Sequence, residues 1–92
     1  MAANVHCPFE ISENALHAEV TQISGWALYN AHGNNASVVE LRNGAADGVL
    51  LAKFAVPSKG SSVESLVGHI DCPGGLYVKE DAGTLSGVVW RG

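Results

Sequence analysis

Apolar and polar residues alternate along several short segments of this 92-residue chain. The pattern is clearest over residues 74–91. There Leu76 and Val78 alternate with Tyr77 and Lys79, an Asp-Ala-Gly turn follows, and a second apolar row begins at Leu85. A period of two residues is typical of β-strands, so this stretch predicts a β-hairpin. Because an isolated hairpin is marginally stable in water, it is expected to complete a sheet that earlier strands begin.

Similar alternation predicts further strands, separated by Gly, Asn, Asp and Pro turn signals. They cover residues 16–21, 26–30, 36–42, 49–56 and 61–67. The 49–56 segment is nearly continuous in apolar residues, which predicts a central strand. With the closing hairpin this makes about seven short strands and no helix. The sequence therefore predicts one all-β domain over residues 15–92, a small antiparallel β-sandwich or jelly-roll-like fold.

Residues 1–14 show little periodicity and are expected to form an N-terminal arm. Phe9 and Ile11 are its large apolar residues, and they pack either on their own domain or on a neighbouring subunit.

The strand assignments also predict which side chains are buried. One face of the strands supplies the predicted core, which consists of Trp26, Leu28, Leu41, Leu50, Phe54, Leu76, Val78 and Val89. The opposite faces still carry large apolar side chains, namely Val38, Val49, Leu51, Val88 and Trp90. Since soluble monomers rarely expose so much apolar surface, these residues predict a contact with another subunit.

Composition narrows the possible partners. The chain is 47% hydrophobic and 15% charged, with a formal net charge of −4. Its five basic residues form no cluster, so direct nucleic-acid binding is not expected. No apolar run is long enough to cross a membrane, and the N-terminus lacks the pattern of a signal peptide, so we expect a protein made in the cytoplasm that binds no membrane.

The residues with catalytic or metal-binding potential form no recognisable motif. There is no framed serine nucleophile and no phosphate-binding glycine loop, and the adjacent Glu80 and Asp81 would point to opposite faces of a strand. Cys7 and Cys72 are interpreted as reduced thiols, with a disulfide as the alternative. A zinc site that also used His6 and His69 is disfavoured, because adjacent ligands rarely close one tetrahedral site. Neither enzymatic activity nor a metal or cofactor is expected.

The aromatic residues leave two interpretations open. Tyr29, Tyr77 and Trp90 could form a platform for a carbohydrate, because aromatic faces stack on sugar rings. Alternatively, Tyr77 and Trp90 are covered by a neighbouring subunit.

Three short motifs point to a family. They are Trp26-x-Leu28-x-Asn30, then Glu40-Leu41-Arg42-Asn43-Gly44, then Gly75-Leu76-Tyr77-Val78 followed by Gly87-Val88-Val89. In this order they resemble small structural proteins of tailed bacteriophages. The resemblance covers residues 23–90.

That resemblance implies a non-enzymatic virion protein, made in the host cytoplasm, that decorates a capsid or builds a fibre. It also implies a homo-oligomer, with a trimer favoured, bound to the major capsid protein or another virion protein. The expected oligomer or lattice interface comprises Phe9, Ile11, Val38, Val49, Leu51, Tyr77, Val88 and Trp90. A carbohydrate- or host-surface-binding module is the alternative, and a bacterial homo-oligomer unrelated to phage is a third possibility.

Overall fold

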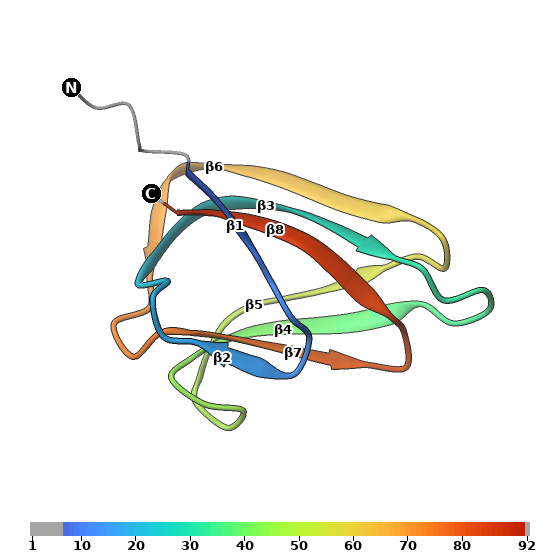
Figure 1. Cartoon of the computed structure of the whole chain (residues 1–92), viewed down its shortest axis with the longest axis horizontal. Helices are drawn as coiled ribbons and strands as arrows, with labels where there is room; N and C mark the ends of the chain where they lie inside the picture. The colour runs from blue at the N-terminus through green and yellow to red at the C-terminus, as the bar shows by residue number, and fades with distance from the viewer. Residues whose placement is uncertain (1–6, 92) are drawn as a thin grey trace.

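The computed structural model describes residues 7–91, and the regular secondary structure of this region is entirely β-strand (Figure 1). The strands are β1 (Cys7–Glu10), β2 (Ala15–His17), β3 (Gln22–Asn30), β4 (Ser37–Asn43), β5 (Val49–Val56), β6 (Ser61–Asp71), β7 (Leu76–Asp81) and β8 (Leu85–Arg91). The all-β prediction is confirmed. The structure has one strand more than expected, because residues 7–10 of the predicted arm form β1.

The strands form two antiparallel four-stranded sheets that pack face to face (Figure 1). Sheet A has the order β1-β8-β3-β6, and sheet B has the order β2-β7-β4-β5. The first strand thus pairs with the last, the second with the seventh, the third with the sixth and the fourth with the fifth. This is the pairing of a jelly roll, in which one long hairpin is rolled into two sheets. The prediction of a single β-sandwich or jelly-roll-like fold is confirmed.

The prediction that residues 74–91 form a hairpin is wrong. β7 pairs with β2 and β4 in sheet B, whereas β8 pairs with β1 and β3 in sheet A. The chain crosses between the sheets at residues 82–84, where the Glu80 carboxylate accepts hydrogen bonds from Gly83 N and from the Ser37 hydroxyl. Both strands bury an apolar row in the same core, so alternation alone did not distinguish paired strands from facing strands.

The segment predicted as the central strand is instead an edge strand. β5 ends sheet B, and its register with β4 shifts between Leu41 and Arg42. The shift is a β-bulge, which reverses the direction of the side chains beyond it. As a result Leu50, predicted in the core, is 45% exposed, whereas Leu51, predicted on the surface, packs against the core.

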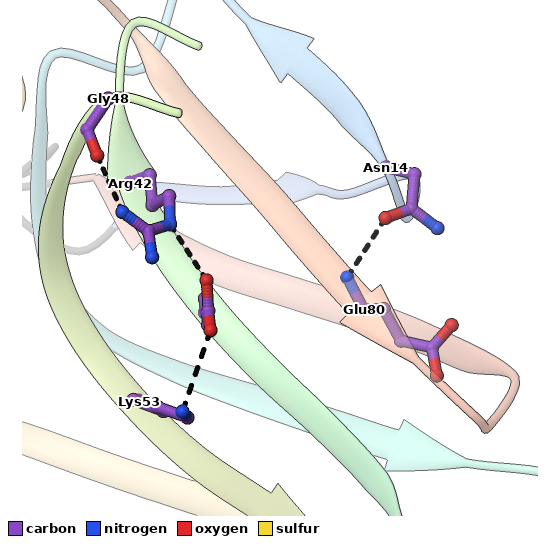
Figure 2. Close-up of polar contacts among 6 residues, drawn as sticks. Asn14, Arg42, Gly48, Lys53 and Glu80 are labelled. Carbon is purple, nitrogen blue, oxygen red and sulfur yellow. Dashed lines mark hydrogen bonds and ion pairs between the residues drawn. The ribbon is translucent and has the colours of Figure 1, made fainter. Parts of the chain in front are cut away.

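The N-terminal segment packs on its own domain. β1 lies along β8, and Ile11, only 5% exposed, belongs to the core. Asn14 holds the corner before β2, since its side-chain oxygen accepts a hydrogen bond from Glu80 N at 2.9 Å (Figure 2). Asn14 has a φ of 55°, a left-handed conformation that Asn tolerates better than most residues.

The core lies between the sheets and contains most of the predicted side chains. Trp26 of β3 stacks on Phe54 of β5, with ring centroids 4.8 Å apart and an interplanar angle of 3°. Phe54 is partly buried, and the other predicted core residues apart from Leu50 are buried, namely Trp26, Leu28, Leu41, Leu76, Val78 and Val89.

Asn30 is a polar exception in the core. It is completely buried, and its amide nitrogen donates hydrogen bonds to Asn35 O at 2.8 Å and Val56 O at 3.2 Å. Its amide oxygen accepts from the backbone N–H groups of His32 and Thr84, both at 3.0 Å. One side chain therefore ties together three segments that connect or end strands of different sheets.

Candidate interaction surface

The outward side of sheet A carries few charges. Because Trp26, Leu28 and Val89 point into the core, their neighbours along each strand point outward. The pairing aligns these outward residues in three rows across the sheet. The rows are Pro8–Trp90–Gly25–Ser65, Glu10–Val88–Ala27–Val63, and Ser86–Tyr29–Ser61. We call these residues the sheet A outer face, and Glu10 is the one charged residue among them. Next to the first row, the outward pair Gln22–Asp71 adds a second carboxylate, which accepts a hydrogen bond from the Gln22 amide at 3.1 Å and lies 3.3 Å from His69 Nε2.

The Trp90 ring lies over Gly25, which has no side chain to occupy the same space. A Cβ atom on Gly25 would come within 2.6 Å of Trp90 Cε3 and 2.3 Å of Glu64 O. Trp90 is therefore half-buried, while Tyr29, in the third row, is 42% exposed. Together they give the face two aromatic rings surrounded by small side chains.

The outward side of sheet B differs in being charged. Its central row is Lys79–Glu40–Lys53, and Arg42 lies beside it. The Arg42 guanidinium donates to Glu40 Oε1 at 2.7 Å and to Gly48 O at 2.7 Å, and Lys53 Nζ lies 3.7 Å from Glu40 Oε2 (Figure 2). The hydrogen bond from Arg42, with the positive charges of Arg42, Lys79 and Lys53, lowers the pKa of Glu40 against the opposing effect of burial. These charges are solvated or paired, and covering them would cost desolvation energy.

The predicted interface residues do not lie on one surface. Val88 and Trp90 are on the sheet A outer face, Val38 and Tyr77 are on the outward side of sheet B, and Val49 is 69% exposed at the start of β5.

The other three predicted interface residues face inward, which corrects the expectation that they are surface contacts. Ile11 is in the core, Leu51 packs against it because of the β5 bulge, and Phe9 is partly buried. The Phe9 and His17 rings are nearly perpendicular, with centroids 5.8 Å apart, and Arg91 Cζ lies 5.2 Å from the Phe9 centroid.

Sequence reasoning missed part of the sheet A outer face. Ala27 and Val63 were not predicted there, and Tyr29 was considered only as part of the aromatic platform. The alternation in residues 26–30 contains the signal for Ala27 and Tyr29, since both lie between inward residues. The platform itself is divided, because Tyr77 lies on sheet B whereas Tyr29 and Trp90 lie on sheet A.

The cysteine and histidine residues do not form a shared site in the described region. His6 lies outside the described residues, and Cys7 and Cys72 are free thiols. Cys72 is buried, its Sγ lies 3.3 Å from Val20 O, and burial together with the charge of Asp71 raises its pKa to about 11. Within residues 7–91 no three His, Cys, Asp or Glu side chains are placed to hold a metal, and no pocket is found.

Residues 7–91 contain no helix of the length and apolar character needed to span a bilayer. Comparisons with protein-family models, curated proteins and solved structures found no significant match to this chain.

Proposed function

We propose that this chain is a non-enzymatic structural protein of a virion, a capsid decoration or head-fibre component that binds a larger protein lattice through the sheet A outer face. The observation that supports the binding surface most strongly is the contrast between the two outward faces. The sheet A outer face has two aromatic rings and small apolar residues, with Glu10 within it and Asp71 beyond its end, whereas the outward side of sheet B has Glu40, Arg42, Lys53 and Lys79 at its centre. The virion assignment comes from the sequence resemblance.

The energetic argument concerns desolvation. Covering the sheet A outer face removes apolar surface from water, which is favourable at about 25 cal/mol per Å². Covering sheet B would remove water from Glu40, Arg42, Lys53 and Lys79, which is unfavourable unless a partner supplies matching charges. The partner is therefore expected to present a flat, weakly charged surface, as a major capsid protein or another virion protein can.

The fold is compatible with this proposal and also with other functions. Jelly rolls occur in viral capsid and lectin domains, and one fold serves many functions. The chain is proposed to act as a homo-oligomer, and the trimer expected from the resemblance stays a prediction.

A pair of matched variants tests the proposed surface. Val88→Lys places a charge in the middle of the sheet A outer face, and Val38→Lys places the same charge on the outward side of sheet B. The probe is purified capsids of a tailed phage, and the measurement is the fraction of protein that sediments with them. We expect the parent and Val38→Lys to bind and Val88→Lys to lose at least about tenfold in affinity, as for a central interface residue. Failure of the parent to sediment would reject the lattice proposal for that capsid, and equal loss in both variants would reject the chosen face.

A second candidate function is carbohydrate binding on the same face. It is favoured by the exposed ring of Tyr29, which shares the face with Trp90 and has Ser61 and Ser86 as its cross-strand neighbours. Tyr29→Ala should abolish binding on a glycan array, with Tyr77→Ala on sheet B as the control. Acrylamide quenching distinguishes the two candidates in the assembled state, because Trp26 is buried and the accessible signal comes from Trp90. A lattice protein should protect Trp90, whereas a sugar-binding protein should leave it accessible.

A further inference from the structure

Strand β6 leaves one edge of sheet A unpaired within the described residues. It pairs with β3 on one side and is the last strand of the sheet (Figure 1). Asn30 N donates a hydrogen bond to Gly60 O at 2.9 Å, so Asn30 and Gly60 are a hydrogen-bonded pair between β3 and the start of β6. Because bonded and non-bonded pairs alternate in an antiparallel ladder, Ser62 and Glu64 also direct their backbone groups to β3.

The intervening residues therefore direct their backbone groups away from the sheet. These are Ser61, Val63 and Ser65, each with one N–H donor and one C=O acceptor on the free edge. Beyond Ser65 the register jumps to Ile70, so the chain bulges away from β3 over residues 66–69. The straight part of the edge is residues 61–65.

The bulge of β6 lies beyond residues 61–65, and within these residues Glu64 is the one charged side chain. Natural edge strands carry lysine, proline or a bulge, which prevent pairing between molecules. The other long edge strand, β5, carries Lys53 near its middle, whereas residues 61–65 contain no proline and no basic residue. Val63, at the centre, is 63% exposed.

We propose that residues 61–65 pair antiparallel with the same residues of a second copy of this chain, about a two-fold axis at Val63. In this register Val63 faces its own counterpart, and Ser61 faces Ser65 of the second copy. Ser61, Val63 and Ser65 all direct their backbone groups toward the second copy. Each of the three resulting pairs exchanges two backbone hydrogen bonds, which gives about six across the contact. The two sheets A become one continuous eight-stranded sheet.

The side chains are complementary in the same register. Ser62 faces Glu64 of the second copy, so no like charges are opposed. The Ser62 hydroxyl accepts a hydrogen bond from Trp26 Nε1 at 3.2 Å and retains its own proton to donate to that carboxylate. On the outward side, the row Val88–Ala27–Val63 continues into the equivalent row of the second copy, with Glu10 at both ends. A different protein would have to match both the Ser62–Glu64 pairing and the outward apolar row, whereas a second copy of this chain matches them by symmetry.

The contact is independent of the proposed lattice function. It uses the edge of sheet A and leaves the outer face uncovered, so either proposal can fail without the other. A two-fold contact closes on itself, so it predicts a dimer or an even-numbered assembly rather than a trimer.

Two charge variants of the same residue test this contact. Val63→Lys and Val63→Glu each place two like charges opposite one another at the axis, whereas an equimolar mixture places opposite charges there. Native mass spectrometry at about 10 μM, with one variant isotope-labelled, should find the parent at twice the 9.5 kDa chain mass. Each variant alone should lose at least about tenfold in dimer affinity, and the mixture should restore a mixed dimer, because like charges directly opposite are destabilising and opposite charges stabilising. Val38→Lys, on sheet B, should remain dimeric.

Three outcomes overturn the proposal: a parent that is monomeric or trimeric at this concentration, charge variants that dimerise like the parent, or a mixture that does not recover. Circular dichroism checks that each variant is folded.

Amide hydrogen exchange tests the same contact in the parent protein, without any substitution. The N–H groups of Ser61, Val63 and Ser65 should exchange more slowly as concentration rises, whereas those of Ser62 and Glu64 should be protected at every concentration. Rapid exchange of all three edge amides at high concentration also rejects the contact.

Discussion

Replacing Asn30 with aspartate tests whether its buried amide holds the two sheets together. The substitution keeps the shape of the side chain and the oxygen that accepts hydrogen bonds from His32 N and Thr84 N. It removes the NH₂ group that donates to Asn35 O and Val56 O. Leaving the buried Val56 carbonyl without its partner costs about 1–3 kcal/mol, and the loss at the partly buried Asn35 carbonyl adds to it. A domain of this kind is stable by about 5–15 kcal/mol, so the variant should lose a large part of its stability.

The loss should depend on pH. Burial and the two facing carbonyl oxygens raise the pKa of the introduced carboxyl, whereas the N–H groups of His32 and Thr84 lower it. Because the site is completely buried, we expect the net pKa in the folded state to lie above the unfolded value of about 3.9. When protonated it donates one hydrogen bond, so the folded variant retains its proton more strongly than the unfolded chain does. This contribution is therefore present below the unfolded pKa and is lost as pH rises through the folded pKa. The deficit relative to the parent should be smaller at pH 4 than at pH 7.

Urea unfolding of the parent and the variant at both pH values measures the effect. Asn34→Asp, an exposed position in the same loop, serves as the control and should change stability by less than about 0.5 kcal/mol. A loss below about 1 kcal/mol at pH 7, or a loss that is the same at both pH values, would refute the reasoning.

Further predictions concern packing and the buried thiol. Gly25→Ala should destabilise the fold by about 1–3 kcal/mol or more, because its Cβ would overlap Glu64 O and Trp90, whereas Gly33→Ala should be near neutral in the same thermal-unfolding assay. Trp26→Ala should cost about 3–5 kcal/mol through loss of the stack on Phe54, and an equally stable variant would contradict its place in the core. Iodoacetamide at pH 8 should label Cys7 in the native protein and Cys72 only after unfolding. Because the folded pKa of Cys72 is raised from 9.0 to about 11, its contribution to stability should be lost as pH rises from 9 to 11, and the Cys72→Ala variant should lack this part of the decline.

The sequence was sufficient to predict the class of fold because burial leaves a period of two in each strand. Trp26, Leu28, Val78 and Val89 lie in the core as that period predicts. The prediction failed at Leu50 and Leu51, where one bulged residue exchanges the inward and outward positions. A bulge depends on pairing with β4, so alternation within β5 contains no sign of it.

The candidate surface was harder to predict than the core. Its three rows combine residues from β1, β3, β6 and β8, which are far apart in the sequence. Alternation indicates that Trp90 and Tyr29 each point away from a core, but it does not indicate which strands are neighbours. Because alternation does not show which strands are neighbours, Tyr77 was expected beside Trp90. Residues 76–91 have the pattern of a hairpin, although their two strands lie in opposite sheets.

The position of β8 has a consequence for how the protein is made. Among the eight strands of residues 7–91 it is synthesised after the other seven, and it lies inside sheet A, between β1 and β3. Until residue 91 has left the ribosome, β1 has no neighbouring strand and β3 exposes one unpaired side. The nascent chain therefore carries open strand edges after seven of these strands have been made, and the sandwich closes only after synthesis of β8. Such non-local pairing folds slowly, so the interval before β8 pairs with β1 and β3 is when these strands are most exposed to aggregation.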